Sequence, residues 1–568
     1  MSVFRLPSPM PESGRLPMGK RAYDGGKTAV TDPLGSCEQT IHINLFFDGT
    51  NNNDAPQNPW RDSKSHTHTN VARLFNATSD LVNKGIYKYY IVGVGTPFPE
   101  IDEHTYSSAG KALAVGFAKR CAWGYTRVLN ALHEALTGRH DDHLIPDDVA
   151  NTICSSLDGD LHSFKLSERE KHLGSIHDAV VRSCQSNRLI KKAHINVFGF
   201  SRGAAGARVF VSKLIKSWAT GGKLIGKIPY EVNFMGLFDT VASVGPPDST
   251  RAAVDFEDFD GHFGWAKGGA LDIPEQVRRC VHFFAMHEQR MSFPLDSIRK
   301  DKSYPADDYR RREVAYPGVH SDVGGSYAPG DQGKSIKGEG HRLGKITLHD
   351  MYIEALKSGV PLYTVDARNE EDRMNDLVQA DFSIDPAVAK AFNDWLAKLP
   401  ALDSLEKAFE YGMRQSLQWR TLRAGWHNRG KYITNQSFYG YCADPANKRE
   451  DSKTPHQLQS ETDEAMKTDP SVQRLQAENE RLHGEIKRIQ DRNMFVRPAP
   501  QVMADMATKK ALEAKIATND AAIAARGKEI MAQKVGKKPS DCRPGEGTSL
   551  HTTPSGWCSA ESRLRSMT

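Results

Sequence analysis

Short strand-like runs, mostly apolar or, at 41–47, alternating between apolar and polar residues, recur through the first two thirds of the chain and end in glycine or polar residues; they predict strands. Five such runs lie at 41–47, 194–200, 233–241, 281–284 and 313–316. Segments with helical spacing, such as 113–136, lie between them. Because strands that alternate with helices are typical of parallel sheets, the pattern predicts an α/β fold: a mostly parallel sheet with helices on both faces.

Changes in composition divide the 568 residues into five predicted parts. Clusters of Pro, Gly and Ser near both ends predict flexible segments, and helical spacing resumes after the last strand. The parts are a flexible arm at 1–36, an α/β domain with loop insertions at 37–360, a helical layer packed on it at 361–460, an antiparallel helical hairpin at 461–536 and a flexible tail at 537–568.

Two stretches of the α/β domain are predicted to be insertions. Residues 137–175 are polar and predict a loop-rich segment. Residues 246–280 combine aromatic side chains with glycines and acids, a pattern that suits a lid over an acyl pocket. Aromatic residues in a long loop more often pack onto the core, so both interpretations of 246–280 stay open.

Two C-terminal segments each carry a narrow apolar seam, with leucine and isoleucine three, four or seven residues apart. The seams contain Leu475, Leu482, Ile486 and Ile489, then Leu512, Ile516, Ile523 and Ile530. A Pro-containing break at 497–500 separates them and predicts a pair of antiparallel helices. Asn479 and Asn519 on the seam argue against deep insertion into a membrane.

The most specific chemical signal is the pentapeptide GFSRG at 199–203, which follows an apolar run and leads into helix-compatible residues. A serine at a sharp strand-to-helix turn needs small residues two positions before and after it, because larger side chains would collide with neighbouring backbone. Such an elbow exposes the Ser201 hydroxyl as a nucleophile and points the Arg202 amide toward a developing oxyanion. The chain has 46 glycines, so a GxSxG pentapeptide can also arise by chance. The alternative to a catalytic serine is a tight strand-to-helix turn with a buried serine.

A serine nucleophile needs an acid and a base, and in α/β-hydrolases both follow the serine, with the histidine last. Asp239 ends a predicted buried strand, at the edge where α/β sheets place their chemistry. His320 follows in a glycine-rich loop, where Asp322 is expected to bond backbone amides. We predict Ser201, Asp239 and His320 as the catalytic residues.

A second oxyanion donor is expected where the first predicted strand ends. The run 41–47 breaks into Asp48, Gly49 and Thr50, followed by three asparagines. The amides of Gly49 and Thr50 are predicted to converge with that of Arg202 on the negative charge of the intermediate. An ordinary Asx turn is the alternative. The oxygens of this loop also suit Ca²⁺, but the EF-hand spacing is absent and no metal is predicted.

Five motifs occur in the order FFDGTNNN, GVGT, GFSRGAAGAR, GLFDTVASVG and YPGVHSDVGG. Over about residues 38–360 they resemble the hydrolase domain of type VI secretion phospholipase effectors of the first Tle family. The resemblance implies an α/β-hydrolase fold, an antibacterial attack on phospholipid ester bonds in a rival's membranes, and an immunity protein in the producer. It assigns the triad to Ser201, Asp239 and His320.

One segment departs from the pattern expected of that family. After the strand at 281–284, where α/β-hydrolases often carry the acid, the chain reads AMHE at 285–288 in place of an expected aspartate. Asp239 therefore stays the favoured acid, and Glu288 and Asp296 are weaker candidates.

Composition narrows the class of protein. With 39% hydrophobic and 26% charged residues, the chain is typical of globular proteins, and no apolar run approaches the ~20 residues of a transmembrane helix. A net charge of +5 is too small to predict nucleic-acid binding. The first residues lack the apolar core of a signal peptide. We expect the chain in the producer's cytoplasm until type VI secretion delivers it to a target cell's periplasm.

The motifs predict a serine-dependent ester hydrolase that needs no cofactor, and the resemblance implies that it is a phospholipase A acting at a phospholipid membrane surface. An immunity protein and a secretion spike protein are its expected partners. Two alternatives remain: a cytoplasmic esterase or thioesterase acting on a soluble acyl substrate, and a hydrolase-like scaffold whose hairpin carries a binding function. A serine, an acid and a histidine in the expected order count against the scaffold.

Overall fold

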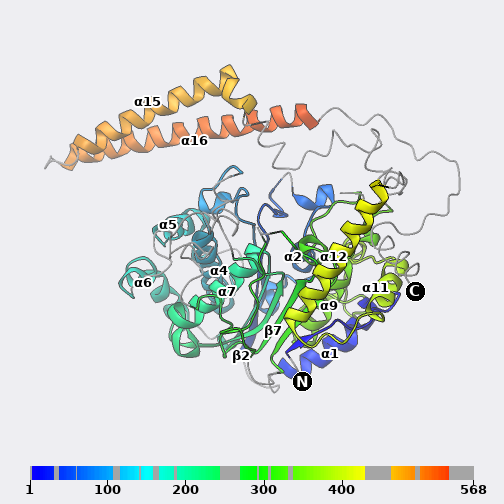
Figure 1. Cartoon of the computed structure of the whole chain (residues 1–568). Helices are drawn as coiled ribbons and strands as arrows, with labels where there is room; N and C mark the ends of the chain where they lie inside the picture. The colour runs from blue at the N-terminus through cyan, green and yellow to red at the C-terminus, as the bar shows by residue number, and fades with distance from the viewer. Residues whose placement is uncertain are drawn as a thin grey trace. The chain divides into compact units, whose positions relative to one another are not determined.

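The computed structural model divides the chain into two units, one of Met1–Asn447 with His551–Thr568 and the other of Lys448–Leu550 (Figure 1). The residues that it describes are 3–30, 38–58, 61–106, 116–139, 143–157, 166–184, 188–242, 269–290, 293–304, 309–330, 335, 337–428, 462, 464–492 and 499–535.

The first unit is built on one eight-stranded sheet in the order β1-β8-β7-β6-β4-β2-β3, with β5 paired to β6. All neighbours along that order are parallel, and β5 is antiparallel to β6. The strands are β1 Phe4–Arg5, β2 Glu38–Phe47, β3 Ile86–Ile91, β4 Leu189–Phe200, β5 Lys223–Leu224, β6 Ile228–Phe238, β7 Arg279–Ala285 and β8 Arg311–Tyr316. The predicted α/β class with a mostly parallel sheet is confirmed.

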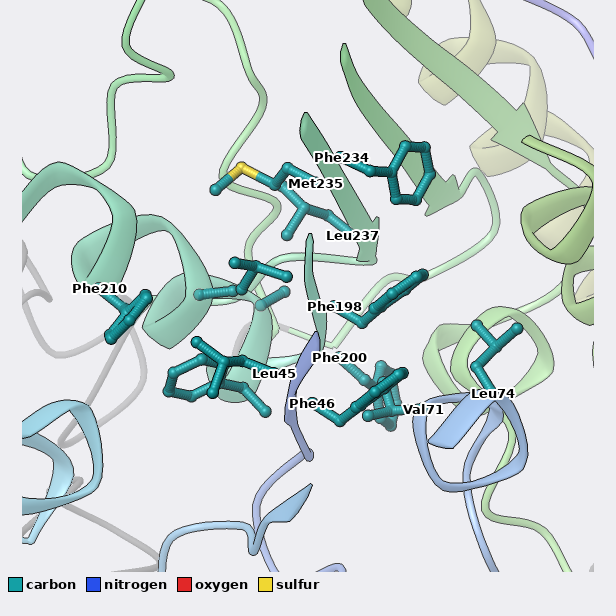
Figure 2. Packing of buried hydrophobic residues seen from close by; sticks show 14 of the residues in the cluster. Leu45, Phe46, Val71, Leu74, Phe198, Phe200, Phe210, Phe234, Met235 and Leu237 are labelled. Carbon is teal, nitrogen blue, oxygen red and sulfur yellow. The ribbon is translucent and has the colours of Figure 1, made fainter. Parts of the chain in front are cut away.

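Helices cover both faces of this sheet (Figure 1). The set comprises α1 Gly19–Val30, α2 Asn70–Asn76, α4 Phe117–Thr137, α5 Asp147–Leu157, α6 Leu166–Ser183, α7 Arg202–Lys213, α8 His320–Gly324, α9 Gly344–Lys357, α10 Asp376–Asp381, α11 Pro386–Leu396 and α12 Leu405–Asn428. Helices α4 and α7 lie on one face, and α2 and α9 lie on the other (Figures 1 and 2).

Aromatic rings from neighbouring strands fill the core beside the predicted elbow. Phe46 on β2 stacks on Phe198 on β4 with ring centroids 4.8 Å apart, and Phe234 on β6 continues the row at 5.4 Å (Figure 2). Phe47 points to the opposite face, where it meets Phe210 of α7. Because both faces are covered, the carboxyl-terminal parts of these strands are free of polar side chains, which explains the hydrophobic runs at 45–47, 197–200 and 234–238.

The predicted flexible arm at 1–36 is wrong for residues 3–30, which form β1 and α1. Strand β1 adds to the sheet edge beside β8, and Phe4 is buried there. Arg15 forms an ion pair with Asp350 of α9. These anchors lie hundreds of residues away along the chain, so local composition carried no sign of them.

The predicted loop-rich insertion at 137–175 is also wrong, because α5 and α6 occupy most of it. Helix α5 buries Ile153 and Cys154, and Asp147 at its start pairs with Arg127 of α4 at 3.1 Å. Most of the candidate lid, the end of the helical layer and the C-terminal tail lie outside the described residues, at 243–268, 429–461 and 536–568.

The second unit contains α15 Pro470–Arg492 and α16 Ala499–Val535, in the region of the predicted hairpin. Leu482, Ile486 and Ile516 form its small apolar cluster. Asn519 Nδ2 donates to Asn479 Oδ1 at 2.9 Å in the middle of the seam. Among the described helices, none combines the length and the apolar character of a membrane span.

Candidate active site

Ser201 sits on a sharp turn between β4 and α7, with φ 57° and ψ −127°. A non-glycine residue at positive φ is strained, and such strain is typical of a nucleophile elbow. A Cβ on Gly199 would lie 2.5 Å from the Ala204 Cα, and one on Gly203 would strike the carbonyl oxygens of Phe47 and Asp48. Both glycines of the pentapeptide are therefore required for the reason that the sequence predicted.

Asp239 and His320 meet at the carboxyl edge of the sheet. Asp239 follows β6, His320 begins α8, and His320 Nδ1 lies 2.6 Å from Asp239 Oδ2. The other oxygen of Asp239, Oδ1, accepts the Ala285 N–H at 2.9 Å. Both side chains are 5% exposed, so little water competes for their contact.

The serine elbow and the Asp239 turn are joined by backbone hydrogen bonds. The Ser201 N–H donates to the Phe238 carbonyl at 3.0 Å, and the Val241 N–H donates to the Ser201 carbonyl at 3.3 Å. Ser201 is thus held by the residues on either side of Asp239. The ring of Phe200 packs on the ring of His320, with centroids 4.6 Å apart.

The two weaker candidates for the acid bind elsewhere. Glu288 Oε2 accepts the backbone N–H of His320 at 3.1 Å and also pairs with Arg290. Burial would raise the pKa of Glu288, but hydrogen bonds from Arg290 and His320 outweigh it and hold that pKa below its usual value. Asp296 Oδ2 accepts the Ala242 N–H at 2.6 Å. Each carboxylate supports a backbone segment next to the site.

Two side chains that the sequence did not single out complete the surroundings of His320. Phe293 packs on its ring with centroids 4.8 Å apart, and Arg290 lies over the Phe293 ring at 4.2 Å. His320 is therefore flanked by Phe200 and Phe293. As predicted, Asp322 bonds a backbone amide: its Oδ2 accepts the Val319 N–H at 2.9 Å.

The loop after β2 lies against the elbow, where Asp48 organises it. Asp48 accepts hydrogen bonds from the hydroxyls of Thr69, at 2.8 and 2.9 Å, and Tyr90. Its Oδ1 also accepts the Gly49 N–H at 2.6 Å. That amide therefore already has a partner within the loop, which favours Thr50 over Gly49 as the oxyanion donor. Tyr90 lies near the end of β3, three residues before the first glycine of the GVGT motif, and this position was the available signal.

Asp62 is a second buried acid beneath this loop. Its Oδ2 accepts the Asn53 N–H at 2.9 Å and the Asn52 Nδ2 at 3.3 Å. Burial is the main cause that raises the pKa of Asp62 to about 8; the charge of Asp48 acts in the same direction, and the hydrogen bonds from Asn53 and Asn52 oppose it. Burial likewise raises the pKa of Asp48 to about 6. The folded protein therefore keeps protons on these carboxyls at pH values where the unfolded chain has released them.

We expect Asp62→Asn to stabilise the protein at alkaline pH. Because the folded pKa of Asp62 lies above the unfolded value, its contribution to stability is complete below about pH 4 and is lost as pH rises toward about 8. An asparagine oxygen can accept both existing hydrogen bonds. The gain in free energy of unfolding should be near zero at pH 4 and exceed about 1.4 kcal/mol, the value of one pKa unit, at pH 8. Urea unfolding at both pH values measures it, and a gain that does not change with pH would contradict the prediction.

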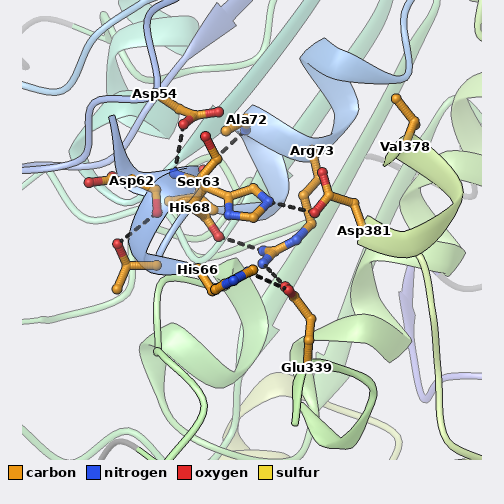
Figure 3. Close-up of polar contacts among 12 residues, drawn as sticks. Asp54, Asp62, Ser63, His66, His68, Ala72, Arg73, Glu339, Val378 and Asp381 are labelled. Atoms are coloured by element: carbon orange, nitrogen blue, oxygen red, sulfur yellow. Dashed lines mark hydrogen bonds and ion pairs between the residues drawn. The ribbon is translucent and has the colours of Figure 1, made fainter. Parts of the chain in front are cut away.

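A cluster beside α2 offers metal-type ligands, since one atom each of His68, Glu339 and Asp381 lie within 4.8 Å of one another. His68 Nε2 lies 2.8 Å from Asp381 Oδ1 (Figure 3). Glu339 is bound by three cations: Arg73 at 2.7 Å, Lys345 at 3.2 Å and Arg342 at 3.3 Å. Because these cations outnumber the carboxylates, we interpret the cluster as an ion-pair network that ties α2 to the segment before α9.

Comparisons with known proteins give a family and two solved structures. The family model for the catalytic domain of Tle1-like type VI secretion phospholipase effectors matches residues 42–220 and 219–354, more than half of the chain. An uncharacterized protein from Pseudomonas aeruginosa has a similar crystal structure, with a TM-score of 0.62 and 26% identity, covering 94% of this chain and 71% of that one.

A second solved structure, the Tle1 effector bound to the VgrG spike of the type 6 secretion system, has a TM-score of 0.33 and 19% identity and covers 66% of this chain and 84% of that one. No curated protein matches the chain.

Proposed function

Because this chain belongs to the Tle1-like family of type VI secretion phospholipase effectors, we propose that it is a phospholipase A that cleaves the carboxylic ester bonds of membrane phospholipids. The observation that carries the proposal is the contact of 2.6 Å between Asp239 and His320, beside a strained serine at the same sheet edge. An acid, a base and a nucleophile in this arrangement suit acyl transfer.

In the proposed mechanism the Ser201 Oγ attacks the ester carbonyl while His320 takes its proton. Asp239 holds the imidazole with its proton on Nδ1, so that the other ring nitrogen accepts. The amides of Arg202 and Thr50 hold the oxyanion. His320 then protonates the leaving lysophospholipid oxygen. Water, deprotonated by His320, attacks the acyl-enzyme, releases the fatty acid and restores Ser201.

Delivery by type VI secretion follows from the family, and we propose the periplasm of the target cell as its destination. Membrane phospholipid is then the proposed substrate surface. We further propose that an immunity protein protects the producer and that a secretion spike protein carries the chain. The two buried asparagines of the hairpin, Asn479 and Asn519, fit a role outside the bilayer for that unit.

The purified chain should release fatty acid and lysophospholipid from vesicles of phosphatidylethanolamine and phosphatidylglycerol, because the proposed site acts on lipid esters. A soluble p-nitrophenyl ester provides the comparison. Faster turnover per active site on vesicles supports the phospholipase. Turnover of the soluble ester alone would favour a cytoplasmic esterase or thioesterase, and no turnover of either would favour the scaffold.

A further inference from the structure

A second acid–histidine pair is buried next to the turn that carries the candidate acid, Asp239. His282 on β7 and Glu313 on β8 face each other in the sheet register, and His282 Nδ1 lies 2.7 Å from Glu313 Oε1. Both side chains have 0% exposure, so neither can reach a substrate. The proposed mechanism uses neither of them, although burying such a pair carries a cost in desolvation.

The hydrogen bonds of His282 define one protonation pattern. The Thr240 N–H donates to His282 Nε2 at 3.1 Å, and the Thr240 hydroxyl lies at 3.1 Å from the same nitrogen. A backbone N–H can act only as a donor, so Nε2 is the acceptor and the ring proton is on Nδ1. That proton is then donated to Glu313.

Glu313 is surrounded by donors. Its Oε2 accepts the Ser297 hydroxyl at 2.7 Å and the Tyr304 hydroxyl, and its Oε1 accepts the Ile298 N–H at 3.0 Å. Burial would raise the pKa of Glu313, but hydrogen bonds led by that of His282 outweigh it and hold the pKa below its usual value. A charged Glu313 therefore keeps the His282 proton on the side away from Thr240.

Thr240 is the residue that follows Asp239, whose backbone is strained at φ 41°. Strained residues keep their conformation only where surrounding contacts impose it. Strand β7 supplies three such contacts. The Phe283 carbonyl accepts the Asp239 N–H at 2.7 Å, and the Ala285 N–H donates to the Asp239 carboxylate. The His282 ring accepts the N–H of Thr240.

We propose that Glu313 and His282 are positioning residues that orient the Asp239 carboxylate toward His320 by fixing the Thr240 amide. The inference rests on the proposed function, since it assigns these residues a role in that same triad. A purely structural pair would stabilise the fold without changing the rate of the chemical step. The two roles therefore differ in the rate per correctly folded active site.

Two amide replacements separate the bonds of His282. In His282→Gln the side-chain oxygen can reach the Nε2 position and accept the Thr240 N–H. In His282→Asn the shorter amide can still donate to Glu313 but cannot reach Thr240. We expect His282→Asn to lower kcat per active site by about 10- to 100-fold with KM nearly unchanged, as small misplacements in a catalytic group do, and His282→Gln to recover most of that loss.

The measurement is ester hydrolysis with the full chain, normalised by titrating reactive Ser201 with a fluorophosphonate, so that misfolded protein is not counted. His349, an equally buried histidine on α9 bonded to the Phe382 carbonyl, provides the matched control: His349→Gln should change stability and leave kcat per active site at the wild-type value. If His282→Asn does not fold, Glu313→Gln is tested instead, and we expect a fall in kcat of about tenfold.

Wild-type kcat per active site in His282→Asn, or in Glu313→Gln if it replaces that variant, would overturn the proposal. Equal losses of kcat in the Asn and Gln variants of His282 would also overturn it, because they would exclude a role through Thr240. Failure of the proposed function is distinct, since the wild-type chain itself would then hydrolyse no ester and bind no fluorophosphonate.

Discussion

Ser201→Ala should lower the kcat for phospholipid hydrolysis by about 10⁶-fold, because triad members act as a unit and the loss of the nucleophile removes the acyl-enzyme route. His320→Ala should cost nearly as much, and the double variant should be no worse than either. Fatty acid release from vesicles measures the loss. The substitution removes one oxygen from a residue whose backbone is held by bonds to Phe238 and Val241, so the fold should be kept.

Ser212→Ala is the matched control for this prediction, because Ser212 is also a buried serine and lies on α7, the helix that Ser201 precedes. It should hydrolyse vesicles at the wild-type rate. A folded Ser201→Ala protein that kept more than about 1% of wild-type turnover would rule out the serine mechanism.

The same variant tests the proposed compartment. A bacterium without an immunity protein should be killed when the wild-type chain is exported to its periplasm, with lysophospholipid and free fatty acid accumulating, and should tolerate the chain in its cytoplasm. Exported Ser201→Ala should be harmless. Killing by the exported variant, or equal toxicity from both compartments, would contradict the effector proposal.

The sequence predicted the features that short stretches of chain encode. The strands around Phe46, Phe198 and Phe234 are covered on both faces, so the half of each strand that holds these rings is apolar and could be recognised from the local sequence. The GFSRG turn could also be recognised from the sequence. Its two glycines are needed because a Cβ at either position would collide with backbone within the turn or at the end of β2.

What the sequence could not predict depends on contacts between distant residues. Phe4 of β1 pairs with Glu313 of β8 at the edge of the sheet, so part of the Pro- and Gly-rich N-terminal segment belongs to the folded domain. Ala150, Ile153 and Cys154 of α5 do follow helical spacing, but they are few within a polar stretch, and their packing partners on α4 lie elsewhere in the chain. The His282 and Glu313 pair was hidden for the same reason: His282 looks like an isolated polar residue in an apolar strand, Glu313 looks like one more charged residue after Arg311 and Arg312, and only the pairing of the strands brings them together.

The contacts of β7 with Asp239 explain why the chain has no aspartate at 285–288. In α/β-hydrolases an acid often follows the strand that corresponds to β7. In the structure β7 instead holds an acid that comes from β6: the Ala285 N–H and the Phe283 carbonyl both bind Asp239. Glu288, the acid that does follow β7, binds the backbone of His320 rather than its ring.

Asp239→Asn should therefore lower kcat by about 10⁴-fold, since an amide at this position lets the wrong His320 tautomer form, as loss of the orienting acid does in serine proteases. The Asn side chain keeps its size and can still accept the Ala285 N–H, so the protein should fold. Vesicle hydrolysis with titrated active sites measures the loss.

Glu288→Gln and Asp296→Asn are the matched controls for that assignment, because each replaces a neighbouring carboxylate by its amide. Both should cost about tenfold or less, since their oxygens support the backbone of His320 and of Ala242 and an amide oxygen can still accept those bonds. A Glu288→Gln protein as inactive as His320→Ala, combined with an active Asp239→Asn protein, would move the acid to Glu288. The 2.6 Å contact between Asp239 and His320 would then be a structural bond, and the catalytic geometry would require His320 to turn toward β7.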